Sequence, residues 1–142
     1  MKRPFGFRTM AILGIVSNSI GILLYPFSLF ALSDPSGSQL AKAIVIIGFF
    51  VGTPLSILGV IASSLLIAER LVGLYLSIAM ISANIVLGLF FAFLQLGGAS
   101  NAADIGAGIW CFFSALTNTA ILLYWVRPSI RWFIKSASAS QV

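Results

Sequence analysis

The sequence has no histidine, one cysteine and three acidic residues in a chain of 142. Imidazoles and paired carboxylates are the usual general acids, bases and metal ligands, so we expect no catalytic, metal-binding or cofactor-binding residues. The single thiol, Cys111, excludes an intramolecular disulfide and a thiolate metal site. We therefore expect a protein that is not an enzyme.

Charge is also scarce, and no charged residue lies deep within the four long apolar runs of the chain. Each run reaches the roughly 20 residues that a helix needs to cross a bilayer. With 60% hydrophobic residues and a mean hydropathy of +1.11, a soluble core could not bury so much apolar surface. Barrel strands would be shorter and would alternate. We predict an all-α integral membrane protein with spans at residues 9–32, 41–68, 71–96 and 105–126.

The connections between the runs are short, which predicts one domain over residues 1–135. Glu69 and Arg70 join the second and third runs with almost no loop. Short links make consecutive helices antiparallel neighbours, so we expect a four-helix up-down-up-down bundle. Residues 128–135 are predicted to form a short interfacial helix, and the polar tail 136–142 is predicted to be disordered.

The basic residues are distributed unequally between the two sides of the predicted bundle. Seven fall at the side of the chain ends, whereas the opposite side has only Lys42. The positive-inside rule then places both termini in the cytoplasm. The net charge of +5 is explained by this topology, and no extramembrane segment is long enough to form a nucleic-acid surface.

Small residues recur at helical spacing within every run, which predicts close helix packing in lipid. We expect the contacts within one chain, and we keep a homo-oligomer contact as the alternative for the second run. Its stripe continues to Ser63, and the third run carries a similar stripe through Ser77. The predicted packing residues are Gly14, Gly21, Gly48, Gly52, Ser56, Gly59, Gly88 and Gly108.

Four polar residues are expected to form a buried cluster at membrane depth: Asn18, Asn84, Asn118 and Thr117. An amide in hydrocarbon needs a hydrogen-bonding partner, and bonds between membrane helices contribute about 0.6 to 2 kcal/mol. Our first interpretation is that the cluster fixes which helix faces meet. The alternative is a contact to a ligand or an ion, although an ion-coupled scheme would need an intramembrane charge that this sequence lacks.

Prolines and phenylalanines mark the outer halves of the spans. Pro26 and Pro54 each remove a helical hydrogen bond, so we expect kinks there. Nine of the twelve phenylalanines form an outer band. Side-chain packing and contact with lipid are sufficient to explain this band. We expect no cofactor, and a lipid, quinone or pigment bound against this band is the alternative.

After the fourth run, Arg127, Arg131 and Lys135 follow one another at intervals of four residues, with Trp132 among them. This spacing puts the three cations on one face of a helix that Pro128 can begin. Such a helix is expected to lie on the anionic cytoplasmic leaflet, and a docking surface for a partner is the alternative.

The segment Leu123–Phe133, with its Arg127-Pro128 step, resembles the ends of small four-span bacterial membrane proteins of unassigned function. The resemblance covers about the last third of the chain. It implies a bacterial inner membrane and assigns no site residues.

Two functions remain after these exclusions. The first is a non-catalytic multi-pass subunit or assembly factor that packs against a larger membrane complex or forms a homo-oligomer. The alternative is a small oligomeric channel or carrier for a neutral or weakly polar solute. We favour the subunit, because no carboxylate, amine, guanidinium or imidazole that could drive transport lies deep within the spans.

Overall fold

The computed structural model describes residues 4–33, 39–99 and 102–139, and within them every regular element is helical. This confirms the all-α class. The elements are α1 (Phe7–Ser28), η1 (Leu29–Ser33), α2 (Gln39–Ile47), η2 (Gly48–Gly52), α3 (Thr53–Ile67), α4 (Leu71–Gly97), α5 (Ala102–Trp125) and α6 (Pro128–Ala139).

Four helical segments in the described residues are long and apolar enough to cross a membrane: Phe7–Ser28, Lys42–Ile67, Leu71–Gly97 and Asp104–Trp125. They coincide with the four predicted runs to within a few residues, and they make the chain a multi-pass membrane protein. The second segment is composed of α2, η2 and α3 in succession. The first continues as the short 3-10 helix η1.

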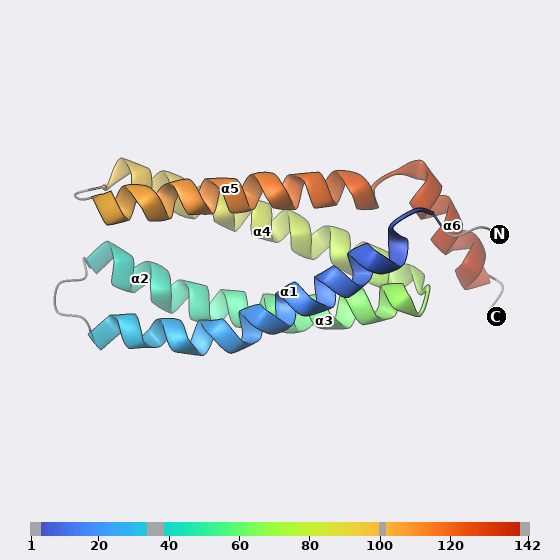
Figure 1. Cartoon of the computed structure of the whole chain (residues 1–142), viewed down its shortest axis with the longest axis horizontal. Helices are drawn as coiled ribbons and strands as arrows, with labels where there is room; N and C mark the ends of the chain where they lie inside the picture. The colour runs from blue at the N-terminus through green and yellow to red at the C-terminus, as the bar shows by residue number, and fades with distance from the viewer. Residues whose placement is uncertain (1–3, 34–38, 100–101, 140–142) are drawn as a thin grey trace.

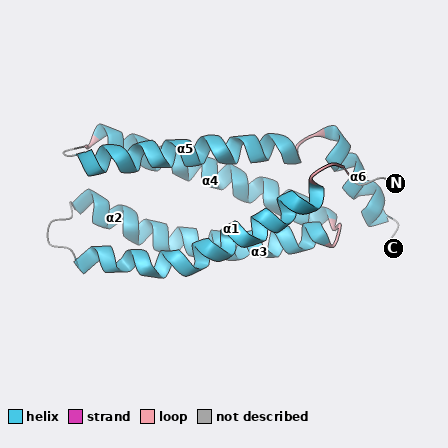
Figure 2. Ribbon diagram, viewed as in Figure 1, coloured by secondary structure: helices cyan, strands magenta, loops and turns pink. Residues whose placement is uncertain are grey.

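The spans form two antiparallel pairs (Figures 1 and 2). In one pair α1 packs along α3, and in the other α4 packs along α5, while α3 against α4 joins the two pairs. We call the end of the bundle that carries α6 the α6 end, and the opposite end the far end. The start of α1 and the link between α3 and α4 also lie at the α6 end.

The link between α3 and α4 is a tight turn centred on Glu69, which has a positive φ of 57°. The Arg70 N–H donates to the Leu65 carbonyl at 2.9 Å, and the Glu69 N–H donates to the Leu66 carbonyl at 2.9 Å. This pair of bonds is the Schellman motif, which satisfies the last carbonyls of a helix without a loop. The hinge therefore ends α3 and starts α4 within three residues.

The two prolines within the spans have different surroundings. Pro26 lies in the last turn of α1, which ends two residues later at Ser28 and continues as the 3-10 helix η1. Pro54 lies in the first turn of α3, directly after the π-helical segment η2. Since proline has no N–H and its ring crowds the carbonyl four residues back, the wider π turn gives that carbonyl room.

The helix α6 closes the α6 end of the bundle. Its apolar side chains Ile130, Phe133 and Ile134 are buried in a cluster with residues of α1, α3, α4 and α5. Phe7 lies at the centre, with its ring centroid 5.7 Å from that of Trp125 and 5.5 Å from that of Phe133. The apolar face of α6 thus packs against the ends of the spans, and its place at the membrane interface stays a prediction.

The prediction of disorder from Ser136 onwards is wrong for residues 136–139, because α6 continues to Ala139. The Ser138 hydroxyl explains the extra turn. It accepts a hydrogen bond from the Leu71 N–H at 3.0 Å and donates one to the Glu69 carbonyl at 3.3 Å. These bonds fix the end of α6 to the hinge, while residues 140–142 lie outside the described part of the chain.

Candidate functional site

The contact between α1 and α3 is a regular alternation of small and larger side chains. Four residues of α1 each face one residue of the second span, and the two helices run antiparallel. Successive contact residues are four, three and four positions apart along each helix. A Cβ added at any of the four glycines would overlap the facing side chain. The pairs are Gly14 with Ser63, Gly21 with Ser56, Asn18 with Gly59, and Tyr25 with Gly52. The stripe of the second span is therefore used within the chain.

Gly48 is the predicted packing residue that does not join this line, because no atom of the described residues lies within 4 Å of the place of its Cβ. The π segment η2 explains the difference. A π turn holds one residue more than an α turn, so the preceding residues rotate by about 100° around the helix axis. In the other pair of spans, Gly88 packs against Ala115, and Gly108 packs against Leu96.

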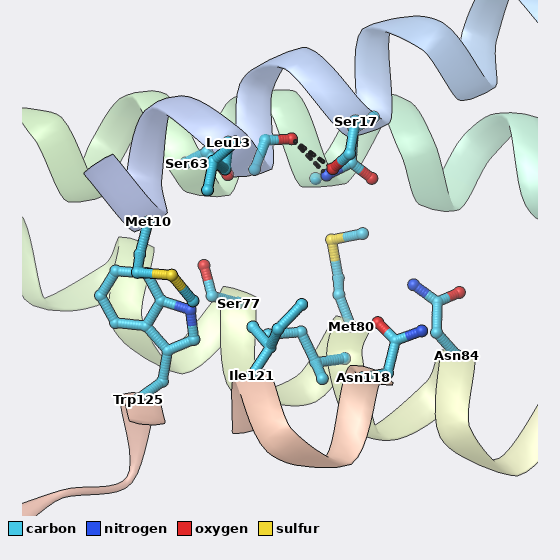
Figure 3. A pocket seen from close by; sticks show the side chains of 14 residues that line it. Met10, Leu13, Ser17, Ser63, Ser77, Met80, Asn84, Asn118, Ile121 and Trp125 are labelled. Carbon is cyan, nitrogen blue, oxygen red and sulfur yellow. Dashed lines mark hydrogen bonds between the residues drawn. The ribbon is translucent and has the colours of Figure 1, made fainter. Parts of the chain in front are cut away.

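A cavity of about 250 Å³ lies inside the bundle towards the α6 end, and we call it the deep cavity. Helices α1, α3, α4 and α5 all line it. Its polar walls are Ser17, Asn18, Ser63, Ser77, Asn84 and Asn118. Figure 3 shows Asn84 and Asn118 side by side on neighbouring helices, with Ser17 on the other side of the space. Met10, Met80 and Trp125 are among the apolar lining residues, with Trp125 towards the α6 end.

A second cavity, of about 470 Å³, lies towards the far end, and we call it the wide cavity. It shares Ser17, Asn18, Asn84 and Asn118 with the deep cavity. We call these four residues the amide cluster. Since they line both spaces, the amide cluster lies where the two cavities meet, about midway along the spans.

The hydrogen bonds of the amide cluster stay within single helices. The Asn18 Nδ2 donates to the Gly14 carbonyl at 2.6 Å, and the Asn118 Nδ2 donates to the Ser114 carbonyl at 2.9 Å. These carbonyl partners fix which end of each amide is the nitrogen. In the described part of the chain, neither amide oxygen accepts a hydrogen bond, and the Asn84 amide makes none. A molecule in either cavity would meet these unmatched groups.

Thr117 lies apart from the other predicted polar residues. Its side chain is exposed, and its hydroxyl donates to the Phe113 carbonyl at 3.0 Å. It lines neither cavity, because it lies one residue, or about 100°, around the helix from Asn118. The sequence predicts a four-residue cluster, and the structure brings only the three asparagines together.

Two serines of the deep cavity were not predicted as site residues. Ser63 and Ser77 are buried, and the sequence interpretation placed both in packing stripes. A small residue that is also polar is ambiguous between packing and ligand contact. The depth of Ser63 and Ser77 in the membrane could have indicated ligand contact. Both serines lie between the level of the asparagines and the α6 end.

The outer phenylalanines mostly face away from the bundle. Phe27, Phe30, Phe50 and Phe93 are each more than 60% exposed, whereas Phe91 lines the wide cavity. A ligand held inside the bundle would therefore meet little of the predicted aromatic band.

The cations predicted at the membrane surface are exposed on α6 and at the residue directly before it. Arg127, Arg131 and Lys135 point away from the buried cluster, and Trp132 is 63% exposed. The Arg127 guanidinium carbon lies 5.5 Å from the centre of the Tyr124 ring, within range of a cation–π contact.

Among residues 4–33, 39–99 and 102–139, no group of three histidine, cysteine or acidic side chains could hold a metal ion. Comparison of the chain with family models, with curated proteins and with solved structures finds no match. The two cavities and α6 are therefore the features of the chain that bear on its function.

Proposed function

We propose that this protein is a non-catalytic membrane carrier that binds an uncharged, hydrogen-bonding molecule at the amide cluster. The observation that carries the proposal is the meeting of three asparagines, from α1, α4 and α5, at one cavity with amide groups left unmatched. Polar groups at membrane depth are costly and commonly mark a ligand or solute path. The sequence alone favours the subunit over the carrier, and we propose the opposite order.

The hydrogen-bond pattern supports binding over helix fastening. If the asparagines fixed helix faces, their amides would bond across helices. The recorded bonds of Asn18 and Asn118 instead go to carbonyls four residues back on their own helices. The contact between α1 and α3 is already made by small residues that face larger side chains.

The lining of the cavities favours an uncharged ligand. None of the described residues that line either cavity is Asp, Glu, Lys or Arg. Moving a bare charge from water into such a space is costly unless an opposite charge is present. Trp125 forms the wall towards the α6 end and is only 3% exposed, so the path is blocked there, as in a carrier rather than an open channel.

Thermal unfolding of the purified protein tests the proposal, with a panel of uncharged compounds such as glycerol, urea and long-chain alcohols. Each compound is kept at or below about 5 mM, because glycerol and urea at high concentration shift the unfolding temperature of any protein through the solvent. A ligand that binds the folded state raises the unfolding temperature by mass action. We expect Asn18→Leu and Asn118→Leu to remove this shift. Thr117→Val is the matched control, because it removes a polar group from the same helix outside the cavities. If no compound gives a shift, or the shift survives in both variants, the proposal is wrong.

A membrane subunit is the second candidate, and the exposed basic face of α6 favours it. Because the apolar face of α6 is already buried, Arg131, Trp132 and Lys135 can present a surface to an acidic partner. Co-purification of a defined protein in mild detergent, lost in Arg131→Glu with Lys135→Glu, would support this role. A lone monomer under all conditions would count against it.

For location, we propose the bacterial inner membrane, as the resemblance of the segment Leu123–Phe133 implies. The α6 end would face the cytoplasm, because Arg8, Arg70, Arg127, Arg131 and Lys135 all gather there.

A further inference from the structure

The wide cavity is apolar over most of its wall, with the amide cluster where it meets the deep cavity and with Tyr25 and Ser28 towards the far end. Aliphatic and aromatic surface comes from four elements, α2, η2, α3 and α4, through Ile44, Val51, Leu55, Leu87 and Phe91. The amide cluster supplies most of the hydrogen-bonding groups where the wide cavity meets the deep cavity. A ligand that matches both parts needs a hydrogen-bonding group at one end and an apolar body behind it.

The described helix contacts join α1 to α3, α3 to α4 and α4 to α5, which leaves the bundle open between α1 and α5. These two helices meet at the α6 end, where Phe7 packs against Trp125 and the Tyr124 hydroxyl donates to the Phe5 carbonyl at 2.9 Å. Further along, α1 packs on α3 and α5 packs on α4. The lining residues at the two facing edges, Ser17 on α1 and Ser114 on α5, are exposed.

This opening lies at the depth of the hydrocarbon core. Ser17 is ten residues into α1 and Ser114 is eleven residues before the end of α5, which at about 1.5 Å per residue puts each roughly 15 Å along its span. A molecule that leaves the lipid phase between α1 and α5 would meet the amide cluster without crossing either membrane surface.

We propose that the ligand is an uncharged amphiphile that enters from the bilayer between α1 and α5. Its hydroxyl, amide or carbonyl group bonds to the amide cluster, and its apolar body lies in the wide cavity. The volume of about 470 Å³ is within the range of 300 to 1,000 Å³ that is common for pockets of organic ligands. The inference depends on the proposed function and adds the ligand class and its route.

A long-chain primary alcohol that carries a photoreactive diazirine in its chain is a direct probe of this site in lipid vesicles. We expect saturable crosslinks at Leu87 and Phe91, which line the wide cavity, and competition by unlabelled alcohol. Leu123, which is 61% exposed on the outside of α5, reports ordinary lipid contact. A carboxylate and an alkane with the same diazirine chain are the matched control probes.

The expected result is that the alcohol alone labels the cavity, at least tenfold above either control probe. Asn84→Leu should reduce cavity labelling because it removes an amide, and Leu87→Trp should reduce it because the larger side chain fills the space. Thr117→Val should leave cavity labelling unchanged. Equal labelling by the alkane, or crosslinks confined to Leu123, would overturn the inference. If glycerol or urea stabilises the protein and the alcohol does not, the proposed function stands and the amphiphile is excluded. If no uncharged compound binds, both fail.

Discussion

The side chain of Asn18 lies in the space that a Cβ on residue 59 would occupy, so Gly59 is what lets α1 approach α3 at this point. An alanine there must displace an amide whose Nδ2 is already bonded to the Gly14 carbonyl. The pair therefore couples helix packing to the position of one member of the amide cluster.

Replacing Gly59 with Ala should destabilise the bundle by about 1 to 3 kcal/mol, the usual cost of overpacking a close contact. Unfolding in detergent or bicelles measures the effect. Gly48→Ala is the matched control, because its Cβ position has no atom within 4 Å in the part of the chain that the structure describes. It should be neutral or stabilising by up to about 1 kcal/mol through helix propensity. Equal effects of the two changes would contradict the packing described here.

Replacing Phe133 with Ala should release α6 from the bundle. Phe133 is 5% exposed and packs on Phe7, so its loss should cost about 3 to 5 kcal/mol. Limited trypsin digestion, followed by mass spectrometry, should then show faster cleavage after Arg131. The neighbouring aromatic residue provides the control, since Trp132 is 63% exposed and Trp132→Ala should leave the cleavage rate nearly unchanged. Cleavage that is equally slow in both variants would mean that Phe133 does not hold α6 in place.

Replacing Ser138 with Ala should loosen the hinge between α3 and α4. The change leaves the Leu71 N–H and the Glu69 carbonyl without the hydroxyl that bonds to both, at a cost of about 1 kcal/mol. Hydrogen exchange should show reduced protection of the Leu71 amide. Ser129, which is exposed on the same helix, provides the control as Ser129→Ala. Unchanged protection of Leu71 in Ser138→Ala would rule out this bond in the membrane.

The gathering of cations at the α6 end predicts the orientation of the chain. A fluorescent protein fused to the carboxyl terminus should be bright, because it folds in the cytoplasm. Alkaline phosphatase fused after Gly98, at the far end of α4, should be active because it is exported. An active phosphatase at the carboxyl terminus would reverse the assignment.

The apolar runs were sufficient to predict the all-α class and the four spans, because length and hydrophobicity alone decide whether a helix can cross a bilayer. It was harder to predict which residues of each span face a neighbouring helix. Gly48 follows the spacing of the stripe, yet the π segment before Pro54 rotates it away from α1, and residue spacing does not reveal a π turn.

The same ambiguity applies to α6 and to the amide cluster. An amphipathic pattern predicts that a helix has an apolar face. It does not indicate whether lipid or a protein side chain such as Phe7 covers that face. The depths of Asn18, Asn84 and Asn118 could be counted from the sequence. Their meeting at one cavity depends on helix rotation, which also separates Thr117 from Asn118.

The three tryptophans of the chain lie in three separate environments, which gives the protein its own set of optical reporters. Trp110, near the far end, is 76% exposed, Trp125 beside the deep cavity is 3% exposed, and Trp132 is on the outer face of α6. Variants that keep one indole at a time would therefore emit from the lipid-facing rim, from the interior or from the surface of α6. Occupation of the cavities and movement of α6 could then be followed as separate shifts in the wavelength of tryptophan fluorescence, without an added label.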